Sequence, residues 1–507
     1  MNEARRLQTV PAIVVFVLCA LGGAREARGQ GATSDRATTV PSDAAARIAR
    51  VERGLLPAVA IRGVRDTAYT LADRLERYSV PGVSIAVIDQ GRVAWTRAYG
   101  ALEAGGAQRV DTTTIFQAGS ISKAITAVAA LRHVERGQLA LDEDVNRRLT
   151  SWKVPASPAK GERLVTLREL LSHSAGFNVP SFPGYAVGES VPTLQQVLLG
   201  TPPSNTPPVS VETEPGRQWS YSGGGITVVQ QLLMDVSHQP FADVLREAVL
   251  VPAGMSATVA EQPLPAARAR TAARGHSSGA TIPGGWRVYP ELAAAGLWST
   301  SVDLARFGIA VMRSIRGDSR ALLRPELARD MAQRQIGDWG LGFALAGTGD
   351  SATVGHDGST AGYVARLLIL PATGQGLAIM TNGESEALLN EIQRAIAREY
   401  NWPVRPRLER TVVAVDPAGY AQLSGRYRVD LGTRAVDFDV SVEGTGSERQ
   451  LLITGPSRRA ARLLPLSDLH FFVQDTGNEF TFTREGKAVT SMLIDQQGQR
   501  FVARRVP

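Results

Sequence analysis

Residues 114–134 read TIFQAGSISKAITAVAALRHV, and the rest of the chain can be interpreted outward from this stretch. Ser120 and Lys123 stand three apart at the start of a pattern of apolar residues that is typical of a helix. Residues three apart share one helix face, so the Lys123 ammonium can reach the Ser120 hydroxyl. A serine hydroxyl is a weak nucleophile unless a neighbouring group takes its proton. The stretch therefore predicts a helix that begins with a nucleophile and its activating lysine.

The same Ser-x-x-Lys spacing occurs at Ser157 and Lys160, but in a different context. There it lies in VPASPAKGE, between prolines and a glycine, and no helical pattern follows. Lysine is rare in this chain, whose cations are nearly all arginine, which stays protonated and cannot shuttle a proton. From spacing alone, a helix cap and a solvated cation are the alternative interpretation of Ser120 and Lys123.

The bulk composition is that of a globular protein. The chain has 507 residues, of which 44% are hydrophobic and 20% charged, so two or three domains are expected. The formal charge of +7 comes from scattered arginines, without a zinc-finger or basic-aromatic pattern, and we expect no nucleic-acid partner. The six histidines show no metal-ligand spacing, so neither a metal nor a cofactor is expected.

The N-terminus has the pattern of a signal peptide, residues 1–29. Arg5 and Arg6 precede an apolar run, Val10–Leu21, that is too short for a comfortable membrane span. The mature chain is therefore expected to be exported, periplasmic or secreted, with no membrane span after cleavage. The only cysteine, Cys19, lies inside this run, so no disulfide is expected. An uncleaved anchor is the alternative.

The order of the remaining patterns predicts an α+β domain over residues 45–400. A hairpin is predicted at 83–99, around the turn Asp89-Gln-Gly91, and apolar strands are predicted at 340–346, 363–370 and 376–382. The helical patterns lie between these two groups of strands. The two ends of the domain should therefore form one antiparallel sheet that is flanked by helices, with an inserted helical subdomain.

Two stretches depart from this pattern. The long, proline-rich stretch 178–216 is interpreted as the rim of a cleft, with a plain surface excursion as the alternative. Residues 401–415 have the composition of a linker, and 416–507 contain short alternating strands that predict a small all-β sandwich or barrel. This C-terminal part carries no nucleophile and base, so binding or structural support is its expected role.

Two further elements carry chemistry. Tyr221 lies in the glycine-rich turn GRQWSYSGGG, where a nearby ammonium is expected to lower the pKa of the phenol from about 10 toward that of a general base. The second element, Gly355-His356-Asp357-Gly358-Ser359, precedes a strand. Its glycines allow backbone N–H groups to approach a ligand, as an oxyanion hole requires.

Together these motifs resemble those of the serine β-lactamase and penicillin-binding-protein superfamily, in its class C and esterase-like branch. Ser-x-x-Lys is present as GSISK, Tyr-x-Asn as YSG and Lys-Thr-Gly as HDG, in that order. The stretches VPGVSIAVI, TLRELLSHSAG, PGRQWSYSGGG and AAAGLWSTSVDLARF are also typical of this family. The resemblance covers about residues 60–400 and implies a β-lactamase/transpeptidase-like domain.

The resemblance also implies a role for each motif residue. Ser120 would be the acylated nucleophile, Lys123 would hold the proton network, and Tyr221 would be the general base. His356 would orient the substrate carboxylate or carbonyl oxygen. The backbone N–H groups of Ser120 and Ser359, beside Gly358, would form the oxyanion hole.

Two positions depart from the family pattern. Gly223 replaces the asparagine, which weakens amide recognition. His356 replaces the lysine and is cationic only below a pKa of about 6.5, so carboxylate binding is expected to depend on pH.

The sequence therefore predicts an exported serine hydrolase that acts through an acyl-enzyme on small esters or D-amino-acid-containing peptides. One alternative is a D,D-carboxypeptidase or β-lactamase with the same residues. Another is a catalytically silent protein that binds peptidoglycan or a lactam. The expected partners are small ester, lactam or peptide substrates, with peptidoglycan fragments as a further candidate.

Three groups of residues have plainer interpretations. Ser277 lies in GHSSG, which matches a nucleophile elbow but lacks the strand before it and the helix after it. His133 and His173 are interpreted as satisfied groups at helix ends. Five aromatic residues are interpreted either as lining of an apolar acyl pocket or as core: Phe177, Phe182, Tyr185, Trp219 and Tyr363.

Overall fold

The computed structural model describes residues 41–403, 407–430, 435–455, 459–486, 488–496 and 498–506. The predicted signal peptide, residues 1–29 with Cys19, lies outside the described residues. The chain forms two compact units, Ala72–Leu389 and a second made of Met1–Leu71 with Asn390–Pro507. Within the described ranges, no helix combines the length and apolarity needed to cross a bilayer.

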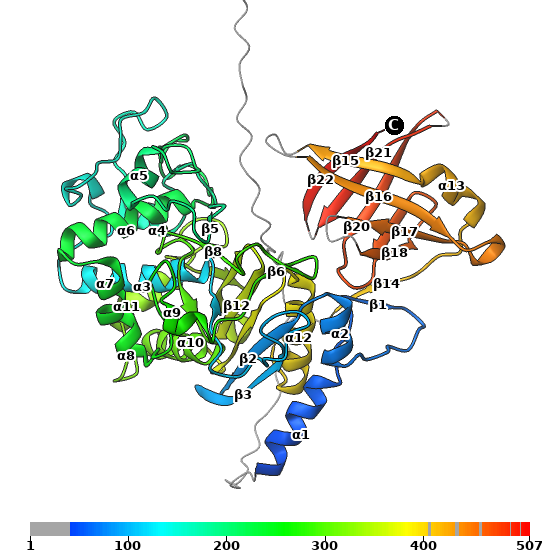
Figure 1. Cartoon of the computed structure of the whole chain (residues 1–507), viewed down its shortest axis with the longest axis horizontal. Coiled ribbons are helices and arrows are strands. Elements are labelled where there is room, and N and C mark those ends of the chain that lie inside the picture. The colour runs from blue at the N-terminus through cyan, green and yellow to red at the C-terminus, as the bar shows by residue number, and fades with distance from the viewer. Residues whose placement is uncertain are drawn as a thin grey trace, which may run out of the picture. The chain divides into compact units, whose positions relative to one another are not determined.

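The unit Ala72–Leu389 is built on an antiparallel six-stranded sheet with the order β10-β11-β12-β13-β2-β3 (Figure 1). Its strands are β2 (Gly82–Asp89), β3 (Arg92–Gly100), β10 (Ala344–Ala346), β11 (Thr353–Thr360), β12 (Tyr363–Leu370) and β13 (Gln375–Thr381). Gln90 and Gly91, between β2 and β3, both have positive φ, as a two-residue hairpin turn requires. The predicted sheet from both ends of the domain, and its α+β class, are confirmed.

The helices between β3 and β10 form the predicted inserted material and gather on one side of the sheet in Figure 1. They are α3 (Ile121–Glu135), α4 (Leu167–Leu171), α5 (Leu194–Leu199), α6 (Gly223–Ser237), α7 (Phe241–Leu245), α8 (Val251–Ala253), α9 (Ala266–Ala269), α10 (Ser301–Arg316) and α11 (Pro325–Met331). Thr166 begins α4 with a complete capping box, as its sequence predicts. Thr300 caps α10 and accepts a hydrogen bond from the N–H of Asp303.

Helix α3 is the central helix of this unit. It packs against α6, α7, β11 and β12, so nearly every one of its side chains is buried. A helix that is apolar on all sides is stable only when it is enclosed in this way. Two polar side chains of α3 bind one neighbouring segment: Ser122 Oγ accepts from the N–H of Leu297 at 3.3 Å, and Thr126 Oγ1 donates to the carbonyl of Ala293 at 3.2 Å. These contacts fix the residues just before α10 against the start of α3.

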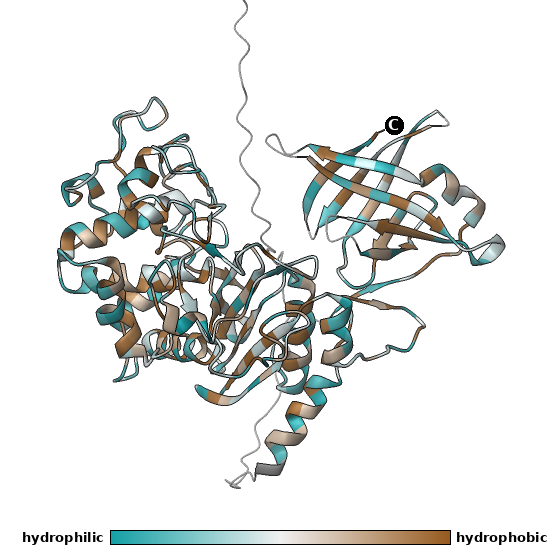
Figure 2. Ribbon diagram, in the orientation of Figure 1, coloured by the Kyte–Doolittle hydropathy of each residue, from teal (hydrophilic) through white to brown (hydrophobic). Residues whose placement is uncertain are grey.

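The second unit contains a closed eight-stranded barrel, so the predicted sandwich or barrel is a barrel. Its strands are β15 (Gly425–Asp430), β16 (Ala435–Glu443), β17 (Gln450–Thr454), β18 (Ala460–Pro465), β19 (His470–Val473), β20 (Glu479–Glu485), β21 (Ala488–Gln496) and β22 (Gln499–Val506). Pairing of β15 with β22 closes it. Hydrophobic and hydrophilic residues alternate along its strands (Figure 2), and aromatic side chains such as Phe471 and Phe482 fill its interior.

The same unit contains the helix α1 (Pro41–Glu52) and a parallel pair of short strands, β1 (Val59–Ile61) and β14 (Leu408–Arg410). Strand β14 lies inside the stretch 401–415 that the composition marks as a linker, so this stretch includes ordered backbone. Helix α12 (Glu386–Glu399) precedes it in the chain. The domain limits drawn from the sequence stay predictions.

Candidate active site

Ser120 is held at the N-terminus of α3 with its hydroxyl available for chemistry. It is the N-cap residue, yet its side chain makes no capping hydrogen bond. Its Oγ instead accepts from Nζ of Lys123 at 3.1 Å. The i, i+3 spacing therefore brings the two groups together, as the sequence predicts.

Lys123 is buried, with 2% of its surface exposed. Its Nζ donates to the carbonyl of Ala294 at 2.7 Å and lies 5.0 Å from the centre of the Tyr221 ring. Burial penalises the charged ammonium and lowers its pKa from 10.5 to about 7. Near neutral pH a large fraction of Lys123 is thus a free amine that can accept a proton.

Tyr221 reaches the same site from the turn that precedes α6. Ser222 caps α6 by accepting from the N–H of Gly225 at 2.8 Å, and its hydroxyl donates to the carbonyl of Asn178 at 2.7 Å. This pins the backbone directly after Tyr221. The Tyr221 hydroxyl is close enough to the Ser120 side chain for the two groups to interact electrostatically. The structure therefore brings Ser120, Lys123 and Tyr221 into one cluster.

The pKa of Tyr221 differs in direction from the sequence prediction. The sequence predicts that an adjacent ammonium lowers it, but burial raises it above its ordinary value of 10, and the interaction with Ser120 offsets only part of this rise. Three aromatic rings surround the phenol, with centroids 4.4 Å (His173), 6.3 Å (Trp219) and 5.9 Å (Trp339) from its own. In this apolar setting the resting Tyr221 is a protonated phenol, and the Lys123 amine is the stronger base.

His356 lies on β11, with its ring centroid 6.4 Å from that of Tyr221. Burial and the nearby Lys123 lower its pKa to about 4, so the prediction of an imidazolium below about pH 6.5 is wrong. Its Nδ1 lies 2.6 Å from the carbonyl oxygen of Asp357. A carbonyl only accepts, so Nδ1 carries the proton and Nε2 of the neutral ring is an acceptor.

Gly358 allows β11 to approach the segment that carries the nucleophile. A Cβ at Gly358 would lie 2.0 Å from the carbonyl oxygen of Ala118, and one at Gly119 would lie 2.8 Å from the backbone nitrogen of Ser359. Only residues without a Cβ tolerate this contact. The backbone of Ser359 is thereby adjacent to that of Ser120, the arrangement an oxyanion hole requires.

Gly223 is the first residue of α6 and has no side chain that could reach Lys123. A Cβ there would lie 2.8 Å from Cε2 of Phe182 and 3.3 Å from the carbonyl oxygen of Pro180. The Phe182 ring, from the proline-rich stretch, thus occupies the space beside Gly223. Phe182 packs against Gly223 and against the hydrophobic core of this unit, and the sequence is compatible with either a pocket or a core position for it.

Ser157 and Ser277, the other two serines with a motif-like sequence context, have different surroundings. Ser157 Oγ accepts from the backbone N–H of Lys160 at 3.1 Å, within a turn. Ser277 lies in the short hairpin β6 (His276–Ser277) and β7 (Ala280–Thr281), and its hydroxyl donates to Glu384 at 2.8 Å. Neither serine has the helix or the buried base that Ser120 has.

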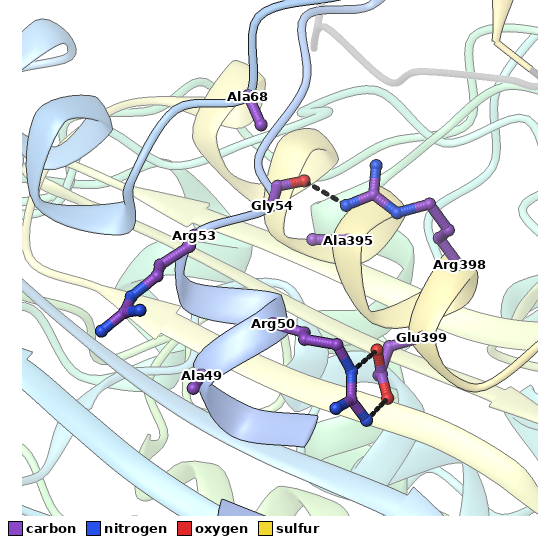
Figure 3. A pocket seen from close by; sticks show the side chains of 8 residues that line it. All are labelled: Ala49, Arg50, Arg53, Gly54, Ala68, Ala395, Arg398 and Glu399. Carbon is purple, nitrogen blue, oxygen red and sulfur yellow. Dashed lines mark hydrogen bonds and ion pairs between the residues drawn. The ribbon is translucent and has the colours of Figure 1, made fainter. Parts of the chain in front are cut away.

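The cavity in Figure 3 differs from the site around Ser120 in its lining residues. It measures about 380 Å³, lies in the unit that contains the barrel, and is lined by α1 and α12 with three arginines, Glu399 and small residues. Arg50 binds Glu399 in a bidentate pair at 2.9 and 2.7 Å, and Arg398 donates to the carbonyl of Gly54 at 2.7 Å. It contains no nucleophile. Across the described part of the chain, no three His, Cys, Asp or Glu side chains cluster as metal ligands would.

His173 and Trp339 are the site residues that the sequence reasoning missed. His173 does follow the end of α4, as predicted, but its ring also packs against Tyr221, and Trp339 packs against both rings and against His356. The signal that could have found His173 is its place in TLRELLSHSAG. Trp339 carries no local signal, since only tertiary packing brings it here.

Known proteins resemble this chain over most of its length. The profile of the family described as Beta-lactamase matches residues 68–400. Penicillin-binding protein 4 of Amycolatopsis lactamdurans is 27% identical over 379 residues, which cover 70% of this chain and 95% of that protein. Esterase EstB of Burkholderia gladioli is 31% identical over 209 residues, which cover 39% of this chain and 52% of that protein.

Solved structures share the fold. The octameric penicillin-binding protein homologue from Pyrococcus abyssi superimposes with a TM-score of 0.59 at 21% identity, covering 85% of this chain and 98% of that one. At this identity the likeness concerns the fold alone. It confirms the predicted β-lactamase/transpeptidase-like architecture.

The pKa of Lys123 predicts the pH dependence of the nucleophile. Below about pH 7 the amine is protonated and cannot accept the Ser120 proton, so labelling by a fluorophosphonate should slow as pH falls and reach a plateau above about pH 8. The labelling rate measured between about pH 5 and about pH 9, corrected for probe hydrolysis, checks this. A rate that is flat, or that rises toward low pH, would contradict the assigned role of the amine.

Proposed function

The chain belongs to the beta-lactamase family, and on this premise we propose that it is an exported serine hydrolase that acts through an acyl-enzyme on small esters or D-amino-acid-containing peptides, with a preference for esters. One observation carries the proposal. The Ser120 hydroxyl lies 3.1 Å from a buried lysine amine and interacts with a buried phenol. Such a set activates a serine without a metal or a histidine–aspartate pair.

The geometry supports the following proton path. The neutral Lys123 amine takes the Ser120 proton as Oγ attacks the carbonyl carbon of the substrate. The Tyr221 phenol then donates its proton to the departing oxygen, and the Lys123 ammonium returns a proton to Tyr221. The backbone N–H groups of Ser120 and Ser359 stabilise the oxyanion. In deacylation, water attacks the acyl carbon and its proton returns to Ser120 through the same groups.

The protonation of His356 favours ester substrates. A peptide that ends in D-alanine presents a carboxylate, which needs a cation or an N–H donor. The neutral His356 ring has its Nδ1–H bound to the Asp357 carbonyl, and its Nε2 can only accept. This argues against the D,D-carboxypeptidase alternative at neutral pH, because the ring offers the carboxylate no hydrogen bond.

The contact between Phe182 and Gly223 supports the same preference. Where the family motif has an amide side chain, this site has an aromatic ring 2.8 Å from the position a Cβ would take. An apolar wall suits the acyl group of an ester better than the amide of a lactam or peptide. The similarity to Esterase EstB of Burkholderia gladioli agrees with this proposal.

A catalytically silent binding protein is the alternative from another class. A protein that only binds has no need of a lysine amine whose pKa is brought to about 7 beside a serine hydroxyl. The complete set of Ser120, Lys123 and Tyr221 therefore supports the enzyme.

Replacing Ser120 by alanine is expected to abolish hydrolysis of p-nitrophenyl acetate and fluorophosphonate labelling, because the buried Lys123 amine is then left without its serine hydroxyl. Ser157→Ala and Ser277→Ala are the matched controls and should keep wild-type rates. Initial rates on the acetate, a D-Ala-D-Ala peptide and nitrocefin measure the effect and rank the substrate classes. Turnover that survives in Ser120→Ala but is lost in Ser277→Ala would overturn the assignment.

Gly223→Asn is expected to destabilise the fold by about 1–3 kcal/mol, because its side chain meets the Phe182 ring and the Pro180 carbonyl. Combining it with Phe182→Ala should recover most of this loss, giving a coupling of about 1–3 kcal/mol in a double-mutant cycle of unfolding free energies. Gly419→Asn is the control, since nothing lies within 4 Å of a Cβ there. Additive effects of the two substitutions would contradict this account of the pocket wall.

Export is also a proposal, drawn from residues 1–29 of the sequence. We expect the full chain, expressed in a Gram-negative host, to lose its N-terminal segment and to appear outside the cytoplasm. Cell fractionation with N-terminal sequencing measures this. A cytoplasmic product that retains Met1 would contradict the proposal.

A further inference from the structure

We propose that His173 is a positioning residue that fixes the Tyr221 phenol over Ser120. The inference rests on the proposed role of Tyr221 as proton carrier. His173 directly follows α4 and its C-cap residue Ser172, and 2% of its surface is exposed.

His173 binds the backbone on both sides of Tyr221. Its carbonyl oxygen accepts from the N–H of Ser220 at 2.8 Å, and its Nδ1 accepts from the N–H of Ser222 at 3.3 Å. One residue therefore fixes the peptide units that flank the phenol. A displacement of the Tyr221 backbone would break at least one of these two hydrogen bonds.

The imidazole ring also packs on the phenol itself. The two centroids lie 4.4 Å apart at an interplanar angle of 46°, and Trp339 supports the imidazole with a centroid distance of 5.1 Å. The phenol thus rests on a ring that is itself held by packing, so its orientation toward Ser120 is defined on one side by His173.

The backbone conformation of His173 is unusual. Its φ of +59° lies in the left-handed region, which is unfavourable for most residues and best tolerated by glycine and asparagine. Such a conformation persists only where surrounding contacts compensate for it, and it is often retained at functional sites. Here the compensation comes from the two hydrogen bonds to Ser220 and Ser222.

The protonation state of the ring fits a positioning role. Because Nδ1 accepts a hydrogen bond, a neutral ring carries its proton on Nε2. Burial, Lys123 and His356 all keep the pKa of His173 well below its ordinary value, so the ring adds no second charge beside the lysine. Among the described residues, Nε2 has no hydrogen-bond partner, and an unpaired buried N–H does not favour folding.

Three substitutions separate the side-chain acceptor from the backbone conformation. His173→Asn keeps an acceptor close to the position of Nδ1 and tolerates the left-handed backbone, whereas His173→Gly tolerates the backbone but has no acceptor. His173→Leu has neither. We expect kcat for p-nitrophenyl acetate to stay within about threefold of wild type in the Asn variant and to fall about a hundredfold in the other two, with little change in KM.

His238→Gly is the matched control, because His238 has a φ of +56° at the end of α6 and is not part of the site. It should keep the wild-type kcat. Thermal unfolding, followed by circular dichroism, identifies variants that do not fold, and His173→Leu serves if His173→Gly is unstable.

A folded His173→Gly or His173→Leu with wild-type kcat would overturn the inference, as would an Asn variant as slow as either. The Tyr221→Phe variant distinguishes an error in the inference on His173 from an error in the proposed role of Tyr221. If Tyr221→Phe is fully active, Tyr221 is not the proton carrier, and the inference on His173 is then wrong as well. If Tyr221→Phe is inactive while His173→Gly is fully active, only the inference on His173 is wrong.

Discussion

Burial of the Lys123 amine is the constraint on which the chemistry of this protein depends. The fall in its pKa from 10.5 to about 7 corresponds to about 5 kcal/mol that disfavours the ammonium. Enclosure of α3 on all sides produces this effect, because it removes water from Lys123 while leaving its Nζ bound to Ser120 and to the carbonyl of Ala294. A surface lysine with the same spacing would stay protonated and could not accept the serine proton.

The remaining elements of the fold bring groups to this amine from distant parts of the chain. The turn before α6 contributes Tyr221, and β11 contributes His356 and the backbone of Ser359. Close backbone contact at Gly358 brings β11 against the residues that precede α3. The aromatic rings around Tyr221 keep water out, so the phenol stays protonated and the lysine is the base. The roles of Lys123 as base and of Tyr221 as proton donor follow from the surroundings of the two groups rather than from their ordinary pKa values.

The sequence predicted the parts of the site that are local. Ser120 and Lys123 meet because of helix geometry, and Thr166 begins α4 because of its capping box, so both could be inferred from spacing. Tyr221 and His356 could be assigned only from family motifs, since no local rule brings residues that far apart together. The pKa of Tyr221 was predicted to fall and that of His356 to keep its ordinary value, and both predictions are wrong, because burial depends on packing that one segment does not encode. His173 was missed for the same reason: its contacts with Ser220 and Ser222 are tertiary. The barrel was predicted as a class, but its closure depends on pairing between its first and last strands.

The central claim is that catalysis passes through a covalent acyl group on Ser120. The most direct measurement is peptide mapping by mass spectrometry of enzyme quenched with acid during turnover of p-nitrophenyl acetate. The account predicts an acetyl group on the peptide that contains Ser120, and on no other, which accumulates and then disappears as the substrate is consumed. Turnover without any acetylated peptide, or with the acetyl group on a different peptide, would contradict it.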